Sequence, residues 1–263
     1  MQPKPVDPAA NFAKAESEIR KAAANGCHVA VLPEYHLTSW VPDHPDFIAS
    51  CAESEAYLPR YQALARELDI SIVPGTICES HPASAHPPPP PQDDKAGTAV
   101  GGAKELRNMA HFVAAGTGAL AGSYQKKNLW HPERPHLSPG RHEPHAAFTR
   151  RCATPTAPPD VDEAGLALNP DSERVFLESS VVCRAFENTA AVVFCNKGGC
   201  SQAALPIVGK VRNEDGKDLG PDEDGTIYTE VDLDVLRIAE ENYKVREDIK
   251  GKGWHYGYEL VRD

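Results

Sequence analysis

The stretch His28-Val-Ala-Val-Leu-Pro-Glu-Tyr35 decides the fold class of this chain. It is a short apolar run that ends at a proline and a carboxylate, the pattern of a buried strand with Glu34 at its carboxyl end. Just before it, residues 7–25 open with Asp7-Pro8, a good helix start, and apolar side chains then recur at helical spacing up to Asn25-Gly26. A helix followed by a buried strand is half of a βαβ unit, so this region predicts the α/β class.

The alternation of helices and strands continues along the chain. Helices are predicted over residues 53–68, 171–187 and 233–243, and strands over residues 70–77, 111–115, 119–124, 190–195 and 226–231. Gly116-Thr-Gly118 predicts a tight turn that joins two of these strands as a hairpin. The segment 81–102 contains five consecutive prolines and cannot form a core, so we predict an insertion loop within one domain of residues 1–263.

Charge and composition exclude several classes of partner. The chain has 263 residues, with 27 Lys+Arg against 38 Asp+Glu and a net charge of −11. This acidic balance argues against binding to nucleic acid or to anionic lipid, because both need clustered basic side chains. The first 30 residues have no apolar signal region, and no apolar run has the length of a membrane span. Seven cysteines without a C-x-x-C pair are typical of reduced thiols, so we expect a cytoplasmic protein without a membrane or nucleic-acid partner.

Three stretches carry residues suited to chemistry. The first places Glu34 at the end of a strand, where open α/β sheets build their sites. The second, residues 124–134, has Lys126 directly after a strand and Glu133 further on. The third, residues 183–196, runs from a helix with an Arg-Ala-Phe-Glu-Asn end into a strand. Taken singly, the first two have ordinary alternatives, because Glu34 could be a solvated loop acid and Lys126 part of a solvated edge.

Taken in this order, the three stretches resemble the nitrilase superfamily of carbon–nitrogen hydrolases. The resemblance covers most of the chain, from the helix at Phe12 to the tail at residues 243–248. It implies a four-layer α-β-β-α sandwich that forms homodimers or higher homo-oligomers and hydrolyses a small-molecule amide or nitrile with a Cys-Glu-Lys site and no cofactor. It further implies that Glu34 is the general base, that Lys126 stabilises charge on the attacked group, and that Glu133 positions the substrate or the base.

The family's nucleophilic cysteine is the part of the pattern that this sequence does not match. A thiolate is the attacking form, so the cysteine must lie beside a base. Cys152 follows Lys126 in the required order, but two arginines and a proline-rich run replace the expected strand and helix around it. Cys152 is thus the candidate nucleophile, although its context favours an ordinary loop thiol. We expect that a segment is missing at residues 150–159 and that the first strand is missing too, so that the sandwich is incomplete.

Two other functions stay open at this point. A family member without a working nucleophile would be an inactive dimerising or ligand-binding protein. A metalloprotein is the third reading, since four histidines crowd one stretch: His131, His136, His142 and His145. Their spacings of five, six and three residues fit no zinc motif, and the prolines between them exclude a helix that would align them. We therefore expect no metal site.

Overall fold

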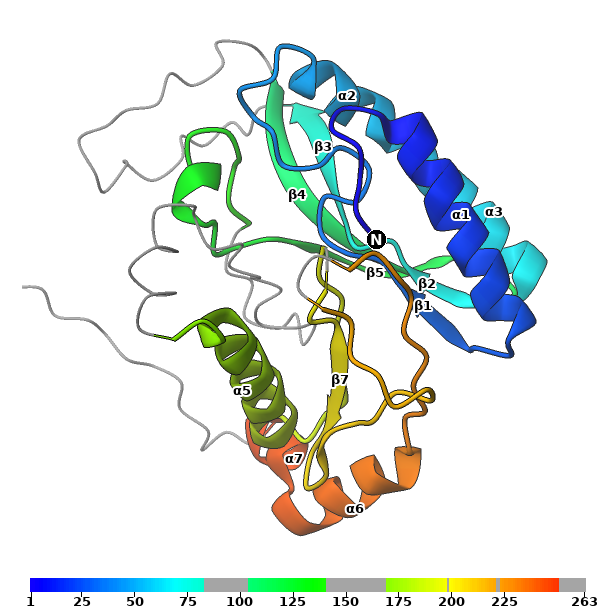
Figure 1. Ribbon diagram of the computed structural model, residues 1–263, viewed down its shortest axis with the longest axis vertical. Coiled ribbons are helices and arrows are strands. Elements are labelled where there is room, and N and C mark those ends of the chain that lie inside the picture. The colour runs from blue at the N-terminus through cyan, green and yellow to red at the C-terminus, as the bar shows by residue number, and fades with distance from the viewer. Residues whose placement is uncertain (83–103, 141–168, 198, 221–222, 251–263) are drawn as a thin grey trace, which may run out of the picture. The chain divides into compact units, whose positions relative to one another are not determined.

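The computed structural model describes residues 1–82, 104–140, 169–197, 199–220 and 223–250. The chain forms two compact units, the first comprising residues 1–158, 195–199 and 222–226 and the second residues 159–194, 200–221 and 227–263. Each unit contains a β-sheet with helices against it, which confirms the predicted α/β class (Figure 1). In the described part of the chain, no helix has both the length and the apolar character needed to cross a membrane.

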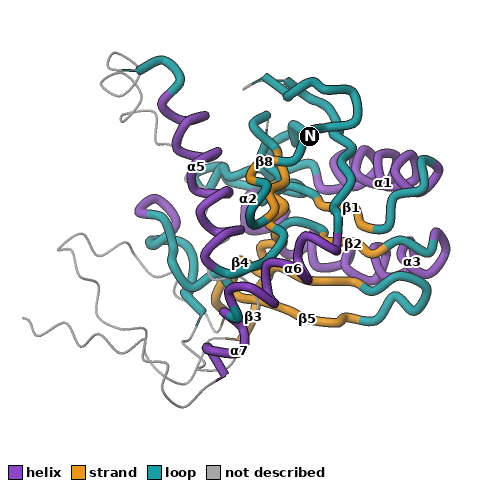
Figure 2. The backbone as a smooth tube through the Cα atoms, turned by 90° about the horizontal axis from the view of Figure 1, so that it is seen from below, coloured by secondary structure: helices purple, strands orange, loops and turns teal. Residues whose placement is uncertain are grey.

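A five-stranded mixed sheet forms the base of the first unit. Its strands are β1 (Val29–Val31), β2 (Ser71–Val73), β3 (Thr76–Pro82), β4 (Lys104–Val113) and β5 (Leu120–Gln125). β1 pairs with β2 in parallel, and β4 pairs antiparallel with β2, β3 and β5. Because β5 occupies one edge of β4, β2 and β3 follow one another along the other edge, and the three long strands lie side by side (Figure 2).

Three helices cover one face of this sheet (Figure 1). They are α1 (Pro8–Ala24), α2 (Phe47–Ser54) and α3 (Leu58–Leu68), with a 3-10 turn η1 (Glu55–Tyr57) between the last two. The predicted first helix is confirmed, with the Asp7 side chain accepting a hydrogen bond from the Ala10 amide at its start. Phe12 on its buried stripe contacts the rings of Tyr57 and Tyr61, with centroids 4.8 and 5.0 Å away. These contacts fix α1 against the helices that follow.

Several elements of the first unit extend further than local pattern predicts. The helical region starts at Phe47 rather than residue 53. The strand predicted over 70–77 is broken at Pro74-Gly75, as its Pro-Gly pair predicts, but its second part continues as β3 to Pro82. β4 begins at Lys104, seven residues before the predicted strand start at His111. Its early part alternates apolar with charged side chains, so its hydrophobic signal is weak, and the pairing with β3 decides its length.

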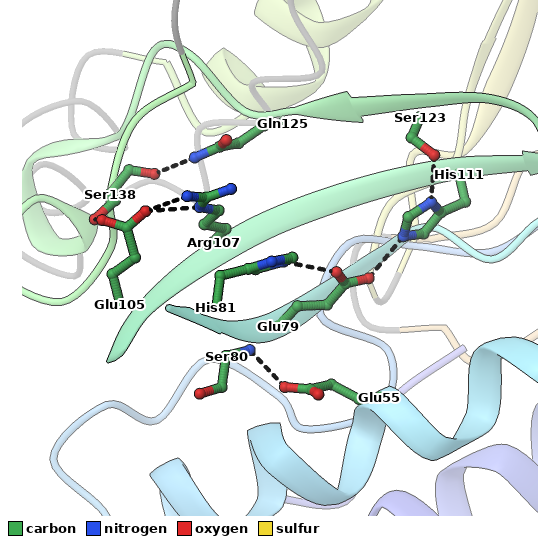
Figure 3. Close-up of polar contacts among 10 residues, drawn as sticks. All are labelled: Glu55, Glu79, Ser80, His81, Glu105, Arg107, His111, Ser123, Gln125 and Ser138. Atoms are coloured by element: carbon green, nitrogen blue, oxygen red, sulfur yellow. Dashed lines mark hydrogen bonds and ion pairs between the residues drawn. The ribbon is translucent and has the colours of Figure 1, made fainter. Parts of the chain in front are cut away.

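The sheet face opposite the helices carries a polar network on β3, β4 and β5 (Figure 3). The Glu79 carboxylate accepts hydrogen bonds from Nε2 of His81 at 2.9 Å and Nε2 of His111 at 2.7 Å. The other ring nitrogen of His111 lies 2.8 Å from the hydroxyl of Ser123. Burial raises the pKa of Glu79, but its hydrogen bonds and charge interactions with His111 and His81 outweigh this and lower it.

The second unit is a three-stranded antiparallel sheet with one long helix against it. Its elements are β6 (Val192–Phe194), β7 (Gln202–Leu205), β8 (Gly209–Lys210), α5 (Ser172–Glu187), α6 (Leu233–Tyr243) and α7 (Val245–Lys250). Val181 and Ala185 of α5 pack against Ala204 of β7. The helices predicted over 171–187 and 233–243 and the strand predicted over 190–195 are confirmed, the strand in shortened form.

One predicted strand is wrong. Residues 226–231 alternate apolar and polar side chains, yet they form no strand in the structure. The carbonyl of Tyr228 accepts one hydrogen bond from the Glu214 amide, and no ladder follows. Alternation alone does not make a strand, because a strand also needs a sheet edge along which to pair. The predicted proline-rich insertion lies almost wholly within 83–103, outside the described residues, so its assignment within one domain stays a prediction.

Candidate active site

The end of β1 positions Glu34. The Leu32 amide donates to the carbonyl of Val73 at 2.9 Å, which continues the pairing with β2 past the end of β1. At the Pro74-Gly75 break the two segments approach so closely that a Cβ on Gly75 would lie 1.9 Å from the carbonyl oxygen of Pro33. Gly75 also has a φ of +58°. Only glycine fits here, and this close approach fixes where the Glu34 backbone leaves the sheet.

The chain turns sharply after Glu34. Tyr35 has a φ of +51°, its amide donates to Oγ1 of Thr76 at 3.2 Å, and its carbonyl accepts from the Ser39 amide at 2.8 Å. A tyrosine in the left-handed region is strained, and such residues cluster at functional sites. The turn buries the Tyr35 ring against that of Trp40, with centroids 4.9 Å apart.

Lys126 directly follows β5 and is held on both sides by backbone hydrogen bonds. Its amide donates to the carbonyl of Asn108 at 2.9 Å, which extends the β4–β5 ladder beyond Gln125. Its carbonyl accepts from the Gly140 amide, also at 2.9 Å. The Lys126 side chain is only 5 % exposed, so a charged ammonium lies in a buried position that requires compensating groups.

Glu133 lies in a 3-10 turn, η2 (His131–Glu133), on the loop that returns from Lys126 to the sheet. Ser138 anchors this loop, since its hydroxyl donates to Glu105 of β4 at 3.0 Å and its carbonyl accepts from the Gln125 side chain at 2.8 Å (Figure 3). Anchored in this way, the loop holds a fully buried carboxylate over the end of β5.

Five polar side chains from four parts of the chain close into a hydrogen-bond ring. The Lys126 ammonium donates to Oε1 of Glu133 at 2.8 Å and to Oε1 of Glu34 at 3.1 Å. The Asn108 side-chain amide donates to the same oxygen of Glu34 at 2.7 Å and to the Tyr35 hydroxyl at 2.9 Å. That hydroxyl in turn donates to Oε1 of Glu133 at 2.5 Å. We call these five residues the hydrogen-bond ring.

The ring fixes the charge of its members. Burial lowers the pKa of Lys126, but the charges of Glu34 and Glu133 and their hydrogen bonds outweigh burial and raise it. Burial and the same two negative charges raise the pKa of Tyr35 well above its ordinary value. The lysine is therefore charged and the tyrosine neutral at pH 7.

An apolar cluster packs behind the ring. Its buried members are Tyr35, Phe47, Cys51, Cys78, Leu106, Leu129 and Leu137. Such surroundings strengthen the electrostatic interactions of the ring, because they keep water away. They also make the buried thiol of Cys78 a poor nucleophile, since a hydrogen bond with Cys51 and burial raise the pKa of Cys78 well above its ordinary value.

The structure brings together three of the four predicted site residues. Glu34, Lys126 and Glu133 converge in the hydrogen-bond ring, as the sequence indicated. Cys152, together with the proposed gap at residues 150–159, lies outside the described residues. His142 and His145 lie outside them as well, and the described histidines, cysteines and acids include no group of three that could hold a metal ion.

Two members of the ring were not found from the sequence. The predicted pattern contains Tyr35 only as the residue after Glu34, and it does not contain Asn108. The one signal for Asn108 is its residue type, because asparagine is disfavoured in strand interiors and a buried one needs a reason. Nothing in its local sequence indicates which partners it has, since Glu34 and Tyr35 lie 74 and 73 residues away.

Residues 1–168 match the family model described as carbon-nitrogen hydrolase. The chain belongs to the carbon-nitrogen hydrolase family. Glu34, Lys126 and Glu133 all lie within the matched residues, as does Cys152. No curated protein matches this sequence significantly.

Solved structures show the same fold as this chain. An amidase from Nesterenkonia sp. AN1 is similar with a TM-score of 0.59 and 18 % identity, over 94 % of this chain and 96 % of that one. The NitFhit protein of C. elegans is similar with a TM-score of 0.56 and 18 % identity, over 94 % of this chain and 62 % of that one. At this identity the likeness concerns the fold alone, and it agrees with the predicted fold, since the Nesterenkonia amidase belongs to the nitrilase superfamily. The match to the family model confirms the predicted family resemblance.

Proposed function

We propose that this member of the carbon-nitrogen hydrolase family hydrolyses a small amide or nitrile by a Cys-Glu-Lys mechanism and releases ammonia. The observation that supports this most is the buried Lys126 ammonium, held 3.1 Å from Glu34 and 2.8 Å from Glu133. The Glu34 carboxylate, at a strand end, supplies a base, and the Lys126 ammonium beside it supplies a positive charge. These are the two groups that a thiol needs to attack a carbon–nitrogen bond.

In the first half-reaction, Glu34 takes the proton of the cysteine thiol and the thiolate attacks the amide carbon. Lys126 uses two of its three ammonium hydrogens in the ring. In the proposed mechanism its third hydrogen stabilises the oxygen that gains negative charge. Glu34 then returns the proton to the amide nitrogen as the carbon–nitrogen bond breaks. Ammonia leaves, and the acyl group remains on sulfur as a thioester.

In the second half-reaction, Glu34 takes a proton from water, which attacks the thioester. The carbon–sulfur bond breaks, the carboxylic acid leaves, and the sulfur regains its proton. A nitrile consumes one further water, because thiolate addition first gives a thioimidate that water converts to the thioester with loss of ammonia. In both half-reactions Glu133 holds Lys126 in place and accepts from Tyr35.

Ammonia release from short aliphatic amides and nitriles tests this proposal. Glu34→Gln and Lys126→Ala are each expected to abolish activity while circular dichroism shows an intact fold. Lys127→Ala is the matched control, because Lys127 neighbours Lys126 in sequence but lies outside the ring, and it should keep full activity. Full activity in Lys126→Ala would contradict the assigned role.

The nucleophile needs a separate test, for which Cys152 is the candidate by chain order. If Cys152 attacks the substrate, an amide substrate should protect it from alkylation, Glu34→Gln should slow that alkylation, and Cys152→Ala should be inactive. If Cys152 is a loop thiol, as its proline- and arginine-rich context favours, neither an amide substrate nor Glu34→Gln should change the rate of its alkylation. An acyl-thioester on Cys152 in the intact mass would decide for the first outcome.

The alternative function is an inactive ligand-binding protein that forms dimers. This alternative is supported if the unaltered protein releases no ammonia from any amide or nitrile, while such a compound still raises its unfolding temperature. In that case the charged ring would bind the ligand without a thiol to attack it.

A further inference from the structure

We propose that Asn108 is a positioning residue of this site, whose side-chain amide holds Glu34 in the deprotonated, Lys126-facing state and aligns the Tyr35 hydroxyl with Glu133. The contacts themselves are independent of activity, and only the consequence for catalysis rests on the proposed function. Asn108 is 0 % exposed, in the interior of β4, so its side chain has one fixed environment.

The neighbours of Asn108 fix the orientation of its amide. Its nitrogen lies 2.7 Å from Oε1 of Glu34 and 2.9 Å from the Tyr35 hydroxyl, so both of its N–H groups are used. In the flipped orientation the amide oxygen would face the Glu34 oxygen at that distance, and two acceptors would repel each other. The nitrogen therefore points to Glu34, and the bond requires that this carboxylate oxygen carry no proton.

This orientation sets the direction of the next hydrogen bond. Because the Tyr35 oxygen accepts from Asn108, the hydrogen of Tyr35 is directed to Glu133, where the two oxygens lie 2.5 Å apart. Asn108 thus links the two carboxylates on the side of the ring opposite Lys126. Lys126 links them by charge, and Asn108 and Tyr35 link them by uncharged donors that cannot lose their hydrogens near neutral pH.

The amide oxygen of Asn108 shows that this position is not optimised for stability. It is buried and has no hydrogen-bond partner among the described residues. A buried acceptor without a donor destabilises the folded state, and native structures contain few of them. An asparagine that leaves one oxygen unpaired in a strand interior, while both hydrogens go to the site, is placed there for the site.

A titration of the carboxylates tests this proposal without any substrate. In protein labelled with carboxyl-13C glutamate, the Glu34 signal is identified by its loss in Glu34→Gln. Asn108→Leu keeps the size of the side chain and removes both donors. We expect the pH at which Glu34 takes up its proton to rise by about one unit or more, because a charged acceptor loses a hydrogen bond. Tyr35→Phe should move the Glu34 titration less than half as far, since the Asn108–Glu34 bond remains.

Asn11→Leu is the matched control. Asn11 is also buried, and its amide donates to the carbonyls of Lys4 and Leu37 at 2.7 and 2.6 Å, outside the ring. It should lower stability and leave the Glu34 titration unchanged. If Asn108→Leu does not fold, Asn108→Thr, which keeps one donor, should give a smaller shift in the same direction.

An unchanged Glu34 titration in a folded Asn108 variant would overturn the proposal, whether or not the protein hydrolyses anything. Conversely, a shifted titration in a protein that releases no ammonia would support the positioning role and count against the proposed function alone. In an active protein, the acid limb of the pH–rate profile should move with the Glu34 titration, and kcat should fall more than KM changes.

Discussion

The burial of the Lys126 ammonium destabilises the folded state, and its contacts with the two carboxylates stabilise it. Removing one ammonium and two carboxylates from water is unfavourable, and their attraction repays this only when the hydrogen bonds are also made. Here they are made, since the ammonium and the Asn108 amide each donate twice within the ring. A ring of this kind is weak evidence for stability and stronger evidence for a site, because apolar residues would fill the same space at lower cost.

Replacing Lys126 shows how much its contacts contribute to the free energy of unfolding. Lys126→Met should lower the free energy of unfolding by about 3 kcal/mol at pH 7, because it leaves two buried carboxylates facing each other. The raised pKa of Lys126 means that its stabilisation is fully present below the ordinary lysine pKa and is lost only as pH rises through the higher, folded value.

Urea unfolding at pH 7 and pH 4 measures the effect. The loss should be smaller at pH 4, where a carboxylate can take up a proton and the repulsion falls. Lys127→Met is the control and should change stability little at either pH. An equal loss for Lys126→Met at both pH values would argue against a charge effect.

The close contact between the end of β1 and the β2–β3 connection determines where Glu34 lies. Three short contacts meet there, because a Cβ on Gly75 would lie 1.9, 2.6 and 2.8 Å from backbone atoms of Pro33 and Leu32. Backbone cannot yield as a flexible side chain can, so the position of Glu34 depends directly on the absence of a side chain at Gly75, on the adjoining β2–β3 connection.

Gly75→Ala should therefore destabilise the protein by about 3 kcal/mol and displace Glu34 from Lys126. Gly26→Ala is the control, since Gly26 also has a positive φ, +78°, but a Cβ there would meet nothing within 4 Å. It should cost about 1 kcal/mol, from backbone strain alone. Thermal unfolding measures the stability of both variants. Equal losses of stability would show that the close contact of Gly75 with Pro33 and Leu32 is not the cause.

The polar network on the opposite sheet face predicts a pH dependence of stability. The pKa of Glu79 is lowered in the folded state, so its contribution is present above the ordinary glutamate pKa and is lost as pH falls through the lowered value. Glu79→Gln should lower the free energy of unfolding by about 1–2 kcal/mol at pH 6, because it removes charged hydrogen bonds with His111 and His81.

Chemical unfolding of Glu79→Gln and the unaltered protein between pH 3 and pH 8 checks this. The difference between them should shrink towards the acid end, as Glu79 takes up a proton. Glu53→Gln, at an exposed site on α2, should show no such trend. A difference that grew as the pH fell would contradict the assigned sign.

In the whole molecule, the second unit leaves large apolar side chains in water. Those on α5 are Val175, Phe176 and Phe186, which are 47, 54 and 50 % exposed. Phe186 packs edge-on against Tyr243 of α6, with ring centroids 5.3 Å apart. Several large apolar side chains exposed on one helix are a feature of interaction surfaces.

We therefore expect the chain to self-associate, as the resemblance to its family also implies. Size-exclusion chromatography with light scattering at micromolar concentration should give a dimer or a larger homo-oligomer. Phe176→Lys should shift the mass towards the monomer, whereas Glu53→Lys, at an exposed polar site of the first unit, should not. A single monomeric species of the unaltered protein would contradict the prediction.

The sequence by itself determined the class of fold, the order of most helices and strands, and three members of the site. Each of these depends on short-range signals, such as the apolar run that ends at Glu34, the strand that ends before Lys126, and the capped helix at Asp7. The family resemblance could be found for the same reason, because it is carried by short stretches in a fixed order.

Only the tertiary structure decided which side chains complete the site and how long the strands are. Asn108 meets Glu34 across 74 residues, and Tyr35 meets Glu133 across 98, because the register of β4 with its neighbours brings them to one place. The length of β4 and the failure of the strand over 226–231 have a related cause. A strand forms where a partner edge offers hydrogen bonds, and the position of that edge is a property of the folded sheet and not of the local sequence.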